Sequence, residues 1–316
     1  MNKTAINPRN VYGDTLVELG EKNPNVVVLD ADLSKSTKTF KFGKRFPDRF
    51  FNMGIAEANM ISVAAGLASC GKIPFASTFA VFAPGRSYDQ IRMSVAYSDM
   101  NVKIFVTHAG VSVGKDGVSH QMLEDIALMR VLPNMSVFAP SDPSQTKKIV
   151  KIMAENRGPM YARIGRESIY PIYDEKELEH MEIGKAINLR MGNDLTIIAC
   201  GTMVNTAVNA AEQLQKDGID TQVVDMWSIK PLDERAILDS SKKTGVVITI
   251  EEHSIIGGLG SAVAEVLAEK GFVGKFKRIG VKDVFCESGE PHDLLEKYSL
   301  NSKYLIKTAK EFVKKK

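Results

Sequence analysis

The chain has 316 residues, a length that allows one large domain or two ordinary ones. Its 44% of hydrophobic and 25% of charged residues are typical of a globular protein, and a net charge of +3 is too small to favour nucleic acid as the main partner. No apolar run is long enough to span a membrane, so a membrane is not expected as a partner either. The expected partners thus include no nucleic acid and no membrane.

The first residues and the cysteines predict a cytoplasmic protein. The polar start Met1–Thr4 does not lead into the apolar segment that a signal peptide contains. Cys70, Cys200 and Cys286 are far apart and odd in number, so they fit neither a disulfide framework nor a zinc site. Each is expected to be a small, buried apolar residue.

Residues 1–173 alternate short apolar, β-rich runs with helical stretches. Gly54–Ala68 is expected to form a helix that Gly71 ends, and Ser141–Ser144 is expected to cap a second helix with one apolar face. The predicted strands are Val26–Leu29, Lys103–Thr107, Ser136–Ala139 and Met160–Ile164. Strands separated by helices predict an α/β domain built on a parallel sheet.

A polar stretch, Tyr173–His180, interrupts this alternation and predicts a linker at residues 174–190. A second βαβ series in residues 191–316 predicts a smaller α/β domain. Its predicted strands and helices are Leu195–Gly201, Val204–Gln215, Thr221–Asp225, Val246–Ile250 and Ser261–Glu269. The glycine cluster Gly257–Gly260 could bind a phosphate at a helix N-terminus, but close packing of that helix on the sheet is the favoured explanation.

A lone carboxylate, Glu57, lies among small and apolar residues in the run Phe51–Met60, where a helix is expected to begin. Burial favours the neutral form of a carboxylate, which can donate a hydrogen bond to the ring nitrogen of a cofactor. The alternative is an ordinary glutamate in the first turn of a helix, stabilised by the helix dipole.

Two histidines flank an aspartate in the glycine-rich segment Thr107–Gln121, which follows a predicted strand. Parallel sheets bind ligands at the carboxyl ends of their strands. His108 and His120 can donate hydrogen bonds or transfer protons near neutral pH, and Asp116 can accept hydrogen bonds from sugar hydroxyls. Their spacing does not fit zinc, so no metal site is predicted; for either histidine alone, a structural role is the alternative.

Ser77–Phe82 presents two phenylalanines, Phe79 and Phe82, which either fill the core of a strand or form a platform for a heteroaromatic ring. Three arginines could bind an anionic group or form ordinary salt bridges. These are Arg86, Arg163 and Arg166.

Together these motifs resemble the C-terminal half of transketolase, over essentially the whole chain. Gly54–Glu57 matches the segment of the cofactor-activating glutamate, and Ser77–Phe82 matches the segment that stacks on the pyrimidine. Ala31–Ser36 is similar to a loop near the thiazolium and the sugar phosphate. The resemblance implies catalytic roles for Glu57, His108 and His120, cofactor binding by Glu57, Phe79, Phe82 and Asp32, and substrate binding by Arg9, Ser36, His108, Asp116, His120 and Arg166.

The sequence contains no Gly-Asp-Gly, the motif with which thiamine enzymes hold a metal ion and the diphosphate. The resemblance therefore implies the C-terminal subunit of a split transketolase, active only with an N-terminal subunit and assembled as α2β2. That subunit would hold most of the Mg²⁺ or Ca²⁺ site. The implied domains are a pyrimidine-binding domain at 1–173 and a transketolase C-terminal domain at 191–316.

The implied reaction transfers a two-carbon ketol unit from a ketose phosphate to an aldose phosphate. Glu57 would hydrogen-bond the aminopyrimidine of thiamine diphosphate, and His108 and His120 would assist proton transfer at the sugar. Asp116 would read the configuration of the sugar hydroxyls.

Three departures from the family pattern leave the sugar specificity open: Ala56–Ala58 in place of Arg-Glu-His, Pro84–Arg86 in place of an aromatic residue, and Lys115 at an often acidic position. They bring the chain toward deoxyxylulose-phosphate synthase and the β subunits of 2-oxoacid dehydrogenases. A non-catalytic interaction subunit and a nucleotide-binding module are further alternatives. The two-histidine loop favours transketolase among these.

Overall fold

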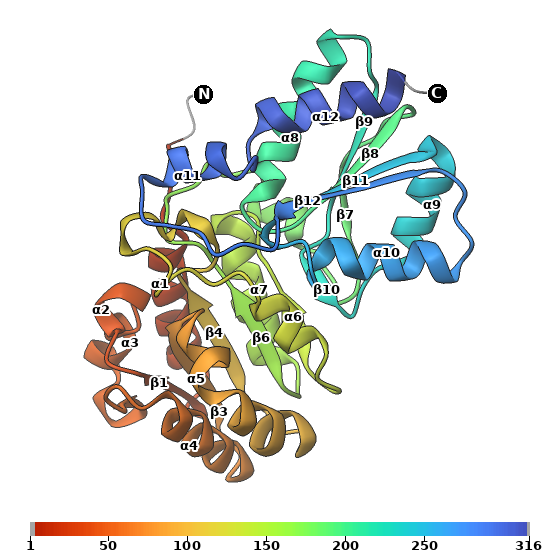
Figure 1. Ribbon diagram of the computed structural model, residues 1–316. Coiled ribbons are helices and arrows are strands. Elements are labelled where there is room, and N and C mark those ends of the chain that lie inside the picture. The colour runs from red at the N-terminus through yellow and green to blue at the C-terminus, as the bar shows by residue number, and fades with distance from the viewer. Residues whose placement is uncertain (1–3, 315–316) are drawn as a thin grey trace.

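The computed structural model describes residues 4–314, which form two lobes that follow the two halves of the sequence (Figure 1). The first three residues, on which the expectation about a signal peptide partly rests, lie outside the described residues. None of the helices between residues 4 and 314 is both long and apolar enough to cross a membrane.

The first lobe is built on a sheet in which, among the described residues, seven strands follow the order β10-β5-β6-β4-β3-β1-β2. Six of these strands are parallel, and β10 at the edge runs antiparallel to β5. The strands are β1 (Val26–Asp30), β2 (Phe50–Asn52), β3 (Ile73–Phe79), β4 (Lys103–Thr107), β5 (Ser136–Phe138), β6 (Met160–Arg163) and β10 (Ser228–Lys230). The predicted parallel sheet is therefore confirmed.

Helices cover this sheet, and their ends follow local sequence signals. The apolar face predicted for the helix after Ser141–Ser144 is buried, and Asp142 caps the helix by accepting a hydrogen bond from the N–H of Gln145 at 2.7 Å. The helical segments are α1 (Pro8–Lys22), α2 (Ser34–Thr37), α3 (Phe40–Arg45), η1 (Pro47–Arg49), α4 (Glu57–Ser69), α5 (Phe82–Gln90), η2 (Ile91–Tyr97), η3 (Val111–Asp116), α6 (Asp125–Arg130), α7 (Pro143–Glu155) and η4 (Glu175–Leu178).

The second lobe contains a smaller sheet, in which five strands of the described chain follow the order β12-β11-β8-β9-β7. All its pairings are parallel except that of β7 with β9. Its elements are β7 (Ile187–Arg190), β8 (Leu195–Ala199), α8 (Met203–Lys216), β9 (Thr221–Asp225), α9 (Glu234–Thr244), β11 (Val246–Ser254), α10 (Leu259–Glu269), β12 (Lys275–Val281), α11 (Pro291–Lys297) and α12 (Ser302–Lys314).

Some details differ from the predictions. Helix α4 begins at Glu57 rather than at Gly54, because Gly54 has a φ of +70°, outside the helical region. Strand β7 falls within the segment 174–190 that is expected to be a linker. Cys200 and Cys286 are buried as predicted, but Cys70 is exposed, since it follows the last turn of α4 at the surface.

The glycine cluster before α10 packs against its own chain. The carboxylate of Glu251 accepts hydrogen bonds at 2.7 Å from the N–H groups of Leu259 and Gly260. A Cβ atom on Gly258 would lie 2.0 Å from that carboxylate, so glycine is required there. Because Glu251 already occupies the N-terminus of α10, the packing interpretation is confirmed and the nucleotide-binding interpretation is wrong.

The two lobes are joined by more than the connecting segment. One buried apolar cluster contains side chains from both lobes, such as Met122 and Leu132 of the first and Ile198 and Leu259 of the second. Strand β10 also comes from the second half of the sequence but pairs with β5 in the first sheet. The interface is thus part of the hydrophobic core.

Replacing Asp142 with alanine should lower the free energy of unfolding by about 3–5 kcal/mol. Its other carboxylate oxygen accepts from the N–H groups of Ile172 and Tyr173 at 2.8 and 2.9 Å, so the substitution removes three hydrogen bonds and not only a helix cap. Asp233→Ala removes two hydrogen bonds of a less buried carboxylate, the cap of α9 and the bond from the N–H of Ala186, and should cost about 1–2 kcal/mol. Equal losses in denaturant titrations of the two variants would contradict this ranking.

Candidate functional site

Most of the predicted site residues lie where neighbouring strands of the first sheet end. Asp32 and Ser36 follow β1, Phe79 ends β3 and Phe82 begins α5, and His108 follows β4. Strands β1, β3 and β4 are adjacent in the sheet and parallel. Their carboxyl ends therefore bring these residues together, as the sequence predicted.

Aromatic rings form a continuous stack at this edge. The ring of Phe79 stacks on that of His108 with centroids 3.8 Å apart and lies nearly parallel to the ring of Phe82 at 5.8 Å. The ring of His120 meets Phe82 edge-on at 5.5 Å. Phe79 is buried and Phe82 is only partly buried, so Phe82 offers the accessible part of the aromatic platform.

The carboxylate of Glu57 lies at the start of α4 and is only 3% exposed. Its Oε1 accepts a hydrogen bond from the guanidinium of Arg86 at 2.8 Å. The same guanidinium lies 4.0 Å from the centroid of the Phe82 ring. Arg86 therefore links the buried carboxylate to the aromatic platform, and its side chain is 47% exposed.

A cluster of cations lies on the other side of His108. Arg9 donates to the carbonyl of Ser36 at 3.2 Å and to the Nε2 atom of His108 at 3.4 Å. Arg166 donates to Oδ2 of Asp116 at 3.2 Å. The side chain of Asn7 connects the two arginines by accepting from Arg9 and donating to the carbonyl of Arg166. Burial and the nearby charge of Arg166 lower the pKa of Arg9, so an anion bound here would relieve repulsion between the cations.

His108 is held as a neutral imidazole. A guanidinium can only donate, so Nε2 accepts from Arg9 and the proton sits on Nδ1, which donates to the hydroxyl of Thr107 at 2.8 Å. Burial, and then the charges of Arg9 and Arg166, lower the pKa of His108 to about 3. His108 also has a φ of +59°, a conformation that costs a non-glycine residue about 1–3 kcal/mol and is concentrated at functional sites.

Asp30 was not predicted as a site residue, yet it fixes the loop that carries Asp32 and Ser36. Its buried carboxylate accepts hydrogen bonds from the N–H of Leu33 at 2.6 Å and from the hydroxyls of Thr37 and Thr39 at 2.7 and 2.8 Å. Burial raises the pKa of Asp30, and these hydrogen bonds oppose that shift. The sequence pattern that could have identified Asp30 is a carboxylate at the end of an otherwise apolar strand, followed within nine residues by Thr37 and Thr39.

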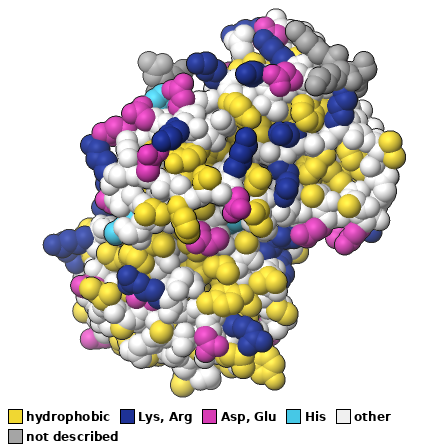
Figure 2. Space-filling view, in the orientation of Figure 1, with side chains coloured by type: hydrophobic (Ala, Val, Ile, Leu, Met, Phe, Trp, Pro, Cys, Tyr) yellow, Lys and Arg dark blue, Asp and Glu magenta, His cyan; other side chains and the backbone are white. Residues whose placement is uncertain are grey.

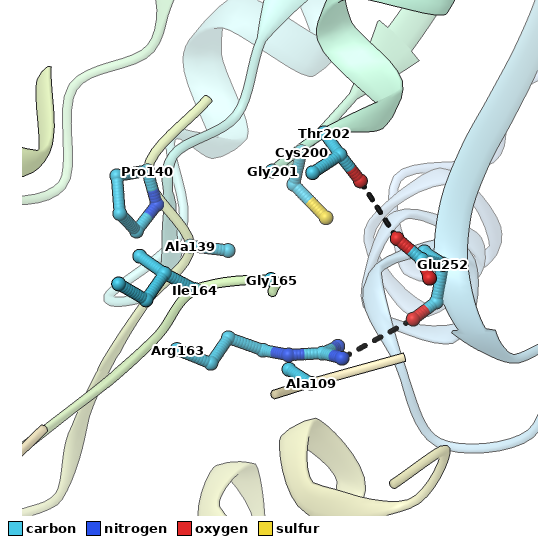
Figure 3. A pocket seen from close by; sticks show the side chains of 10 residues that line it. All are labelled: Ala109, Ala139, Pro140, Arg163, Ile164, Gly165, Cys200, Gly201, Thr202 and Glu252. Carbon is cyan, nitrogen blue, oxygen red and sulfur yellow. Dashed lines mark hydrogen bonds between the residues drawn. The ribbon is translucent and has the colours of Figure 1, made fainter. Parts of the chain in front are cut away.

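The three arginines that the sequence offered as anion-binding candidates have different surroundings. Arg166 lies in the cation cluster, whereas Arg86 pairs with Glu57. Arg163 is buried and forms an ion pair with Asp125 at 3.1 Å. Figure 3 shows Arg163 at a small cavity between the lobes, of about 30 Å³, where it donates to the main-chain carbonyl of Glu252. Arg163 therefore belongs to the interface between the lobes.

The charged residues do not form a broad field of one sign on the face drawn in Figure 2, where basic and acidic side chains are interspersed. Between residues 4 and 314, no three His, Cys, Asp or Glu side chains are grouped so that they could hold a metal ion. The chemistry that the chain itself offers is thus a buried carboxylate, an aromatic platform, a neutral imidazole and a local cation cluster.

We expect His108 to stay neutral from pH 8 down to about pH 5 in an NMR titration of its imidazole in the isolated chain. Because this pKa lies below the unfolded value of 6.5, the neutral ring contributes stability that is fully present above pH 6.5 and is lost as the pH falls toward 3. Arg9→Ala should raise the pKa without restoring 6.5, since burial is the larger cause. Arg45→Ala, on the surface of α3, is the control that should leave the titration unchanged, and a wild-type midpoint near 6.5 would contradict the prediction.

Comparisons with known proteins agree with this architecture. The family of the transketolase pyrimidine-binding domain matches residues 4–171, and that of the transketolase C-terminal domain matches residues 184–305. A predicted transketolase C-terminal section from Methanocaldococcus jannaschii is 52% identical over 97% of this chain and 96% of that protein. The 6-deoxy-6-sulfo-D-fructose transketolase subunit SqwH of Clostridium sp. strain MSTE9 is 42% identical over 98% of this chain and 95% of that protein.

A solved structure described as a split gene transketolase, an inactive β4 tetramer, superimposes with a TM-score of 0.90 at 52% identity. The similarity covers 98% of this chain and 99% of that chain. The two matched domains also follow the order found here, in which a parallel sheet precedes a smaller α/β lobe. The chain therefore belongs to the transketolase family and corresponds to its C-terminal section.

Proposed function

We propose that this chain is the C-terminal subunit of a two-chain, thiamine diphosphate-dependent transketolase, which transfers a two-carbon ketol unit from a ketose to an aldose. One observation supports the proposal: in a chain of this family, a continuous series of contacts joins the buried carboxylate of Glu57, through Arg86, to the aromatic pair Phe79 and Phe82 and to the two histidines His108 and His120.

The site has the chemistry that the pyrimidine end of the cofactor requires. Phe82 provides a partly accessible ring face for stacking, and Glu57 provides a buried carboxylate that can share a proton with a ring nitrogen. A heteroaromatic ring bound to both would take over the two contacts that Arg86 makes in this structure. The bound cofactor would supply the electron sink that cleavage of a carbon–carbon bond requires.

The remaining residues suit a sugar with a terminal anion. His108, neutral and next to a cation cluster, would bind a sugar hydroxyl, and His120 would assist proton transfer at the same substrate. Asp116 would accept hydrogen bonds from hydroxyl groups. The anion would be bound by Arg9, Arg166 and the loop of Ser36, the region where the cations repel one another. Asp32, with a φ of +63° in the same loop, would lie beside the thiazolium end of the cofactor.

A second subunit would complete the cofactor site. This sequence has no Gly-Asp-Gly motif, so we assign the diphosphate and its Mg²⁺ or Ca²⁺ to an N-terminal transketolase subunit. Two relatives of similar length support this arrangement, because one is named as a transketolase subunit and the other as a split gene transketolase whose β4 form is inactive. We propose an α2β2 assembly.

The reaction is tested by reconstitution. With thiamine diphosphate and Mg²⁺, the purified chain alone should not transfer ketol units, whereas its mixture with the N-terminal subunit should. Pyruvate decarboxylation by the same mixture is the control for a 2-oxoacid dehydrogenase or a deoxyxylulose-phosphate synthase. Full activity of the chain alone would refute the two-chain arrangement, and turnover of pyruvate instead of ketoses would refute ketol transfer.

Glu57→Gln should lower ketol transfer by the reconstituted enzyme by more than about 100-fold while leaving assembly intact. Glutamine fills the same space but cannot share a proton with the pyrimidine, so exchange of the C2 proton of the cofactor, followed by NMR, should slow as well. Glu21→Gln alters an exposed carboxylate on α1 and should change neither quantity by more than about twofold. Unchanged exchange in Glu57→Gln would remove this residue from the mechanism.

Arg166→Ala should weaken the use of phosphorylated acceptors by about 10- to 150-fold, from about 1.5–3 kcal/mol for a charge-assisted hydrogen bond. Unphosphorylated analogues of the same aldoses should be affected much less, because they lack the anion. Arg235→Ala, a surface arginine on α9, should not discriminate between the members of each pair. Steady-state kinetics on matched acceptors decides, and equal losses for both members would make Arg166 structural.

A further inference from the structure

The segment that carries His108, Asp116 and His120 is held by both lobes: Arg166 of the first lobe donates to the carbonyl of Val113 at 2.8 Å, and the second lobe provides further contacts. The segment leaves β4, passes through η3 and crosses below α11, which packs against it (Figure 1). The second lobe contributes contacts from two places. One is Glu252 on β11, and the other is the stretch 287–291 before and at the start of α11.

The carboxylate of Glu252 binds the loop directly. Its Oε1 accepts a hydrogen bond from the main-chain N–H of Ser112 at 2.7 Å, and its Oε2 accepts from the hydroxyl of Thr202 at 2.8 Å. The side chain is only 7% exposed, and its bond to Thr202 is drawn in Figure 3. A buried carboxylate keeps its hydrogen-bond donors in place, because a donor that lost its partner would be left unsatisfied in a dry interface.

The loop backbone approaches this carboxylate so closely that a side chain would not fit. A Cβ atom on Gly110 would lie 2.3 Å from Oε1 of Glu252, and Gly110 also has a φ of +88°, which favours glycine. Gly110 is two residues from His108, so the carboxylate holds the backbone close to the residue that carries the imidazole.

The other end of the loop is held by the stretch 287–291. The amide of Gln121 donates to the carbonyls of Val111 and Glu287 at 3.2 and 3.0 Å. The hydroxyl of Ser288 donates to the carbonyl of Lys115 at 2.6 Å. These contacts lie beside Asp116 and His120, so the second lobe contacts the loop near both of its functional ends.

From these contacts we propose that Glu252 is a positioning residue, and that the second lobe takes part in the reaction by fixing the loop that bears His108, Asp116 and His120. The inference rests on the proposed ketol transfer for its catalytic consequence. Glu252 does not touch the aromatic platform or the cation cluster; it acts through the backbone of Ser112 and Gly110. Displacement of a histidine should mainly lower kcat, because its hydrogen bonds must be aligned in the transition state.

The test compares Glu252→Ala with Glu252→Gln in the full chain and in the reconstituted enzyme. Alanine removes both contacts, so kcat should fall about 10- to 100-fold while KM for the acceptor changes less than about threefold. Glutamine can still accept from Ser112 and bond to the hydroxyl of Thr202, so it should restore kcat to within about fivefold of wild type. A KM effect without a kcat effect would overturn the positioning role.

A second readout does not depend on the reaction. Hydrogen–deuterium exchange of the isolated chain should be at least about fivefold faster across residues 109–117 in Glu252→Ala and unchanged in β4 and α7. Thr202→Val preserves the shape of that side chain and removes its bond to Glu252, so it should accelerate the same peptides even where Glu252→Ala folds poorly. Unchanged exchange in the loop would overturn the inference.

The matched control is Glu265→Ala, because Glu265 of α10 pairs with Arg130 of α6 and so also joins the lobes, but away from the loop. It should leave both loop exchange and kcat unchanged. Equal effects in the two alanine variants would mean that general docking of the lobes, and not Glu252, is responsible.

Faster loop exchange with unchanged kcat in Glu252→Ala would also overturn the proposal. Absence of ketol transfer by the wild-type complex would instead refute the proposed function, while the exchange experiment would still decide whether Glu252 anchors the loop.

Discussion

Buried carboxylates that accept hydrogen bonds from backbone N–H groups hold the loops of both lobes. Asp30 binds the loop after β1, Asp142 binds the start of α7 and the chain at residues 172–173, Glu251 binds the start of α10, and Glu252 binds the loop after β4. A carboxylate taken out of water is costly unless its oxygens are bonded, and backbone amides supply those bonds without any side chain. Each loop therefore has one favourable position, which a helix dipole or apolar packing alone would not specify.

This arrangement allows the site to combine groups that would otherwise repel one another. Arg9 and Arg166 lie beside a histidine that stays neutral, because burial, and then the charges of the two arginines, lower the pKa of His108. The imidazole consequently keeps one fixed donor and one fixed acceptor across the physiological range. Left-handed backbone at Asp32 and His108 shows that both loops are held in conformations that unconstrained chains avoid.

The sequence predicts what depends on local pattern. Strands with uninterrupted apolar runs, such as β1, and the capped helix α7 follow from composition and capping alone, and Glu57 and the two histidines stand out because they interrupt apolar or glycine-rich stretches. Features that depend on distant partners cannot be found in this way. Glu252 follows Glu251 at what looks like the ordinary end of a strand, so nothing local marks it. Its partner Ser112 is 140 residues away in the sequence. Strands β7 and β10 are too short for a periodic signal, and their pairing is decided by the neighbouring sheet edge.

Strand β10 has a consequence for where this protein can be divided. It belongs to the stretch matched by the C-terminal domain family, yet it completes the sheet of the first lobe, and the ring of Trp227 beside it packs 5.4 Å from that of Phe138 on β5. A fragment that ended after the pyrimidine-binding domain would leave the hydrogen-bonding groups of β5 unpaired along an apolar edge, which is a template for aggregation. The two matched family domains are therefore units of sequence rather than units of folding, and a gene that was split or recombined between them would have to carry β10 with the first sheet.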